Sequence, residues 1–183
     1  MRSMLAVPLA MTAALVLAGC DRADKGPKSL DEAKAEARQL DRPEPGQYEQ
    51  TTKFTKFEVP GAPKEMVEQL KGMIQGQGQT AKYCLTKEDS EKGFEGMFKK
   101  VGQGECKYDR FDATSSTIDA IMVCDTGDGG SARLAMNGTV SKTGSAVKVN
   151  VQQKNDKTPM GNADISMEVS SKRLGDCPGG ASG

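Results

Sequence analysis

The second half of the chain alternates between apolar and polar residues. Turn-forming residues divide it at positions 125–130, 141–144 and 155–161. The apolar positions fall in four groups: Ile118, Ala120, Met122 and Cys124; Leu134, Met136 and Val140; Val147, Val149 and Val151; and Ile165, Met167 and Val169. Alternation of this kind is typical of antiparallel strands with one apolar face and one face in water. The pattern therefore predicts an antiparallel β-meander from residue 105 onward.

The first half mixes strands with helices. Residues 48–59 are rich in Thr, Phe and Tyr, and residues 79–85 form a second short run, so both are predicted strands. The apolar phase shifts between Phe54 and Phe57, which indicates a β-bulge or a bend near residues 55–56. Between the strands, helical spacing predicts an amphipathic helix whose apolar residues are Met66, Val67, Leu70, Met73 and Ile74.

A second helix is predicted after Thr86, which can cap its N-terminus. Its apolar face would consist of Phe94, Met97, Phe98 and Val101, while Gly93 and Gly96 each weaken it by roughly 1 kcal/mol. The predicted fold class is α+β: a curved antiparallel meander of about six to seven strands, with two amphipathic helices packed on one face.

The N-terminal segment has the features of a secretory signal. Arg2 precedes an apolar run over residues 5–17, which is too short for a membrane span and ends in small residues. The sequence Leu17-Ala18-Gly19-Cys20 resembles the lipobox of bacterial lipoproteins. That resemblance implies a signal peptide over residues 1–19 and a lipid, palmitate included, on Cys20. It also implies anchoring to a membrane of the cell envelope, facing the periplasm, with inner or outer membrane left open. The alternative is an ordinary secreted protein.

Residues 20–45 are predicted to be a charged tether. Ser29 and Glu32 have the spacing of a capping box, and a thin apolar face predicts a helix that is marginal unless it docks on the domain. That face consists of Leu30, Ala33, Ala37 and Leu40. Residues 46–178 form the predicted globular domain, and residues 179–183 a disordered tail.

Composition argues against catalysis and against nucleic-acid binding. Without residues 1–19 the chain loses one of its 25 basic residues, Arg2, and none of its 25 acidic residues, which leaves a net charge of −1. Such a charge gives no long-range attraction to nucleic acid. The chain has no His, which is the commonest general base and the commonest metal ligand. We therefore expect a non-catalytic protein without metal or cofactor.

Four cysteines remain once Cys20 is assigned to the lipid. An even number in an oxidising compartment predicts two disulfides, for which three connectivities exist. No pair has the C-x-x-C spacing of a zinc site. If residues 105–112 and 117–124 form a hairpin, Cys106 lies opposite Cys124, within disulfide range. We therefore predict Cys106–Cys124, which leaves Cys84–Cys177.

Several short motifs resemble a known family. They are Pro45-Gly46-Gln47-Tyr48-Glu49, Pro60-Gly61-Ala62-Pro63, Tyr83-Cys84-Leu85-Thr86, Cys106, Cys124 and Arg173-Leu174-Gly175-Asp176-Cys177. Together they resemble the domain of unknown function 3617 of Gram-negative envelope proteins, over about residues 45–178. The resemblance implies no activity and no catalytic residues.

Two functions are consistent with the sequence. The first is a non-catalytic structural or interaction protein of the envelope, which presents a surface to another envelope protein or to peptidoglycan. The second is a carrier that holds a lipid or other apolar ligand in a half-barrel-like sheet. They differ in whether the inner face of the sheet is filled by the protein's own side chains. Methionine-rich copper binding and a calcium loop at residues 125–130 are weaker interpretations than core packing and a hairpin turn.

Overall fold

The computed structural model describes residues 26–75, 79–94, 105–127, 129–157 and 161–180. The elements in chain order are α1 (Leu30–Ala37), β1 (Gly46–Glu58), α2 (Lys64–Gln75), β2 (Gln79–Leu85), α3 (Lys87–Lys92), β3 (Glu105–Ala113), β4 (Thr117–Gly127), β5 (Gly130–Ser141), β6 (Gly144–Lys154), β7 (Ala163–Gly175) and the 3₁₀ turn η1 (Pro178–Gly180). The predicted signal and Cys20 lie outside these residues, so the lipid anchor stays a prediction. Within the described ranges, no helix is long and apolar enough to cross a membrane.

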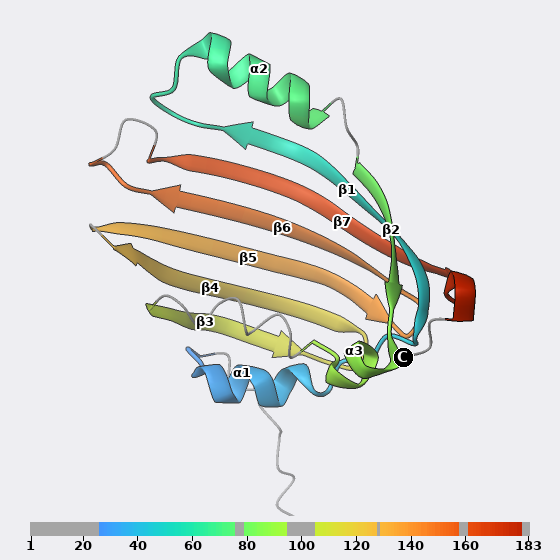
Figure 1. The fold of residues 1–183 in the computed structure, drawn as a ribbon. Coiled ribbons are helices and arrows are strands. Elements are labelled where there is room, and N and C mark those ends of the chain that lie inside the picture. The colour runs from blue at the N-terminus through green and yellow to red at the C-terminus, as the bar shows by residue number, and fades with distance from the viewer. Residues whose placement is uncertain (1–25, 76–78, 95–104, 128, 158–160, 181–183) are drawn as a thin grey trace, which may run out of the picture.

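Seven strands of the described residues form one open antiparallel sheet, in the order β2-β1-β7-β6-β5-β4-β3. The ribbon shows a sheet that curves strongly, with β2 folding over one end (Figure 1). The predicted fold class is confirmed. The predicted bulge is confirmed as well, because the β1–β7 register shifts between Phe54 and Lys56.

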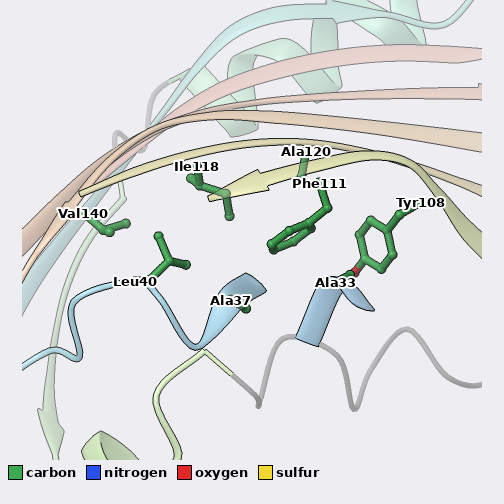
Figure 2. Close-up of a cluster of buried hydrophobic side chains, with 8 residues drawn as sticks. All are labelled: Ala33, Ala37, Leu40, Tyr108, Phe111, Ile118, Ala120 and Val140. Atoms are coloured by element: carbon green, nitrogen blue, oxygen red, sulfur yellow. The ribbon is translucent and has the colours of Figure 1, made fainter. Parts of the chain in front are cut away.

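The two faces of the sheet differ in polarity, as the alternation predicts. Directly paired residues share a face in an antiparallel sheet, and Val147 pairs with both Gly138 and Val169 on the apolar side. On the other side Lys148 pairs with Glu168, with 3.8 Å between Nζ and the carboxylate. Figure 2 shows the sheet arching over the apolar side chains, so this side, called the inner face below, is concave.

Curvature depends on a close approach between β5 and β6. A Cβ on Gly138 would overlap the carbonyl oxygen of Ala146 and crowd the backbone of Val147. Only glycine permits this spacing, and a glycine inside a strand commonly marks such a bend.

Helix α1 docks on the inner face at the β3 edge. Its cap is the predicted capping box: the Ser29 side chain accepts from the Glu32 amide, and Glu32 accepts from the Ser29 amide at 2.7 Å. The helix, the segment that follows it and the sheet together bury one apolar cluster (Figure 2). Its members are Ala33, Ala37, Leu40, Tyr108, Phe111, Ile118, Ala120 and Val140. Part of the predicted tether is therefore integral to the fold.

Backbone contacts hold the rest of this segment. The amide of Lys28 donates to the Tyr108 carbonyl at the edge of β3, at 2.8 Å. Asp41 donates to the Ser115 carbonyl and Glu44 to the Lys142 carbonyl, each at 2.7 Å. Residues 26–45 thus follow the inner side of the sheet from β3 to the start of β1.

The buried Lys28 is the main polar anchor of α1. Its side chain is 8% exposed, and its ammonium pairs with Glu36 of the helix and donates to the Phe111 carbonyl at 2.9 Å. Asp112 lies 3.9 Å from the same ammonium. One cation therefore joins the helix to β3.

We expect Lys28→Met to lower the free energy of unfolding by about 2 kcal/mol, because hydrogen bonds to a buried charge are lost. The amides of α1 should then exchange with solvent faster than those of β5. Lys34→Met is the matched control, since Lys34 pairs with Asp31 on the surface, where ion pairs contribute under about 1 kcal/mol. An equal decrease in the free energy of unfolding in both variants would contradict this role for Lys28.

The other helices differ from the prediction in length and packing. Thr86 caps α3 as predicted, but the helix ends at Lys92, because Gly93 adopts a positive φ of 55°. Phe94 therefore lies beyond the helix, and Met97, Phe98 and Val101 lie outside the described residues.

Helix α2 lies beside β1, and its Met66 and Met73 side chains are 40% and 57% exposed. Among the described helices, α1 rather than α2 or α3 therefore covers the inner face.

A polar network on the outer face has a consequence for acid stability. The Asp164 carboxylate accepts hydrogen bonds from Lys56 at 2.9 Å and from Asn150 at 2.8 Å. The bond from Lys56, first, and the bond from Asn150 hold the pKa of Asp164 below its usual value. Because this pKa is lower in the folded state than in the unfolded state, where it is about 3.9, ionised Asp164 stabilises the fold at a pH above the unfolded-state pKa. This stabilisation is lost as the pH falls through the folded-state pKa.

We therefore expect Asp164→Asn to flatten the fall in stability below about pH 4. The measurement is the urea midpoint at pH 7 and at pH 3. Wild type should lose more stability between these values than the variant, and the control Glu91→Gln, on the exposed surface of α3, should behave as wild type. A variant with the wild-type pH dependence would contradict the role of Asp164.

Candidate functional site

The described residues cover the inner face only in part. Beyond α1, it carries an apolar surface that we call the apolar strip, formed from four neighbouring strands. All of its side chains are half-buried in the described structure. Its members are Phe54 and Phe57 of β1, Ile165, Met167 and Val169 of β7, Val147, Val149 and Val151 of β6, and Leu134 of β5.

Core packing does not extend over this strip. Among the described residues, every buried hydrophobic side chain except Tyr48 belongs to the cluster under α1. Met136 marks the boundary, since it packs against that cluster while its neighbours in β6 and β7 do not. The described side chains therefore bury the inner face over β6, β7 and β1 less completely than the cluster under α1. How completely this face is filled is the feature that separates the two predicted functions.

A pocket of about 130 Å³ lies on the inner face, towards the end of the sheet where β2 folds over. It spans five strands and is walled by Tyr48, Tyr83, Leu85, Phe94 and Val140, with Pro43 beside them. Ser145 and Ser171 line the same pocket. Its lining is mostly apolar with few polar groups, the composition typical of small-molecule sites.

Tyr48 fixes the wall of this pocket. Its side chain is 1% exposed, and its hydroxyl donates one hydrogen bond, shared between the Glu44 carbonyl at 2.8 Å and the Lys142 carbonyl at 3.0 Å. Tyr83 of β2 stacks on it, with ring centroids 5.6 Å apart. Burial raises the pKa of both phenols, so both stay neutral at physiological pH and the wall is uncharged.

One polar pair lies in the pocket. The hydroxyls of Ser145 and Ser171 are 2.9 Å apart across the β6–β7 pair, and both residues are half-buried. Both side chains point to the inner face, in phase with Val147 and Val169. Sequence reasoning missed this pair, because two serines at the ends of apolar strands look like ordinary strand termini.

The cysteines form both predicted disulfides. Cys106 and Cys124 are directly paired across β3 and β4, with Cα atoms 4.0 Å apart. Cys84 of β2 is bonded to Cys177 after β7, with Cα atoms 5.6 Å apart. The second bond ties the edge strand β2 to the C-terminal end of the chain.

Groups of metal-ligating side chains are a further kind of candidate site in the described part of the chain. No group of three His, Cys, Asp or Glu residues is placed there to hold a metal ion. In the loop weighed as a calcium site, the Asp125 carboxylate accepts from the Gly127 amide at 2.8 Å, which is the contact of a turn.

Fold and site together define an α+β domain with two disulfides, built on one open, curved antiparallel sheet whose apolar inner face the described residues cover in part. The chain belongs to the family described as protein of unknown function (DUF3617), whose model matches residues 43–177. No match was found among curated proteins or among solved structures. The matched region begins after α1, so the helix that covers part of the inner face lies outside it.

Proposed function

We propose that this protein is a non-catalytic binding protein of the cell envelope that holds an apolar molecule with an acyl chain on its inner face. The observation that supports this most strongly is the half-buried apolar strip, which continues the inner face beyond the cluster covered by α1. Each methylene group that a ligand buries there would contribute about 0.8 kcal/mol.

Shape and charge favour a small apolar ligand over a protein surface. The face is concave (Figure 2), and the pocket that Phe94 helps to line lies at one end of it. Along β6, the inner-facing residues are Ser145, Val147, Val149, Val151 and Gln153, without a charge. Protein interfaces carry a polar rim with charged pairs, whereas acyl chains require uncharged apolar walls.

Placement in the envelope is supported by the lipobox-like sequence ending at Cys20. Because Lys28 is already held against β3, eight residue steps separate it from the predicted lipid. Those steps span at most about 26–29 Å. Such a short link would keep the inner face close to the membrane that carries the anchor.

The proposal is tested by binding of a fluorescent acyl probe to the protein from residue 21 onward. We expect Val149→Asp to weaken binding by more than tenfold, because a carboxylate in the strip must be desolvated. Ala146→Asp is the matched control, since Ala146 is exposed on the outer face of the same strand. Wild-type protein that does not bind the probe, or equal effects of the two substitutions, would contradict the proposal.

A second role, presenting a surface to another envelope protein, is favoured by one observation. Helix α2 exposes Met66 and Met73 at the β1 side of the sheet, far across it from α1. Methionine-rich surfaces are common at adaptable protein-binding sites. The two roles use different parts of the molecule and are separable by substitutions in α2.

A further inference from the structure

The polar pair in the pocket specifies what kind of ligand head the inner face would accept, if the proposed binding of an apolar ligand holds. Ser145 and Ser171 face each other at one end of β6 and β7. Each hydroxyl carries one donor proton. Their mutual hydrogen bond uses one proton, so the pair keeps a second that can be donated to a ligand.

The pair stands at the start of an apolar path. From Ser145 and Ser171, the register continues on the same face through Val147 with Val169, Val149 with Met167 and Val151 with Ile165. Six residue steps along an antiparallel strand span about 20 Å. A chain that begins at the hydroxyls therefore meets only apolar pairs along this length.

The charged side chain that follows the pair on the inner face of β7 already has its own partners. The inner-facing residue after Ser171 on β7 is Arg173, whose guanidinium donates to the Pro45 carbonyl at 2.9 Å and pairs with Asp176 at 2.8 Å. Among the described residues that line the pocket, none is charged. A ligand carboxylate or phosphate would lose hydration there without gaining an ion pair.

We propose that Ser145 and Ser171 bind the uncharged acceptor head of an acyl ligand, such as an ester carbonyl oxygen, with its chain lying along the β6–β7 apolar pairs. The donor is the hydroxyl proton that the pair does not use internally. Tyr48 and Tyr83 flank the head through their neutral rings. The ligand class is therefore a neutral acyl ester or amide rather than a free fatty acid.

The experiment compares methyl laurate, laurate and dodecane as competitors of the fluorescent acyl probe, with protein from residue 21 onward. For wild type we expect methyl laurate to compete best. In the double variant Ser145→Ala with Ser171→Ala, the affinity for methyl laurate should fall about tenfold, the loss expected for one hydrogen bond. Dodecane affinity should not change. Ser170→Ala, on the outer face beside Ser171, is the matched control.

Three results would overturn the inference. If laurate competes best, the head site is cationic. If the double variant loses no affinity for methyl laurate, the hydroxyls do not bind the head, while binding of the chain, and with it the proposed function, still stands. If wild type binds none of the compounds and is dimeric in solution, a second copy covers the inner face, and the proposed function fails as well.

Discussion

Replacing Cys84 and Cys177 together by serine is expected to lower the free energy of unfolding by about 4.7 kcal/mol. The bond joins residues 93 positions apart, and the entropy that it removes from the unfolded chain grows with the length of the closed loop. The same relation gives about 3.2 kcal/mol for Cys106–Cys124, which joins residues 18 positions apart. Removing the disulfide that closes the longer loop should therefore lower the free energy of unfolding more.

The structure adds a local reason for the larger loss. The side chains of β2 are exposed at every position except Leu85, so burial holds this edge strand only weakly. Without the bond from Cys84 to Cys177, we expect the β2 amides to exchange much faster than those of β6. Urea unfolding of both double variants, beside oxidised wild type, measures the difference. A larger loss for the Cys106–Cys124 variant would contradict this account.

The second large effect is expected at Phe111. This side chain is 1% exposed beneath α1, and it meets the Tyr108 ring edge to face at a centroid distance of 5.3 Å. We expect Phe111→Ala to lower the free energy of unfolding by about 3–5 kcal/mol, because it leaves a cavity in the cluster. Thermal or urea unfolding measures this loss.

Phe54→Ala is the matched control, since Phe54 lies on the same inner face but in the apolar strip, where it is only half-buried. Its loss should be about 1 kcal/mol, while binding of the acyl probe should weaken more than in Phe111→Ala. Similar losses of stability in the two variants would indicate that the strip is a packed core, which contradicts the proposed function.

Much of the sheet could be predicted because its two faces have different environments. The alternation from Ile118 to Val169 follows from one apolar and one wet face, and it fixes which residues share a face. The same logic placed Cys106 opposite Cys124 and the bulge near Phe54. These features depend on local periodicity, which the sequence carries directly.

The docking of α1 and the length of α3 could not be predicted in the same way. The apolar face of α1 is thin, and its position depends on a buried Lys28 whose partners lie far along the chain. Gly93 ends α3 before the apolar residues that were assigned to it, because a residue that readily adopts a positive φ can end a helix there.

The candidate site was only partly visible in the sequence. Its apolar strip is the same set of residues that predicts the strands, so the sequence cannot say which of them are covered. Among the described residues, coverage depends on where α1 packs, and α1 packs at the β3 side of the sheet. The pocket at Tyr48 and Tyr83 forms because β1 and β2 pair beside β7, a tertiary arrangement with no local signal.

The central claim is that the inner face holds an apolar ligand, and the mass of the protein tests it most directly. The domain from residue 21 onward would be exported without its lipid cysteine and purified without detergent, then measured under native and denaturing conditions. We predict an excess native mass that disappears on denaturation and extracts as lipid. A native mass equal to that of the chain less the four hydrogens lost to its two disulfides would contradict the claim.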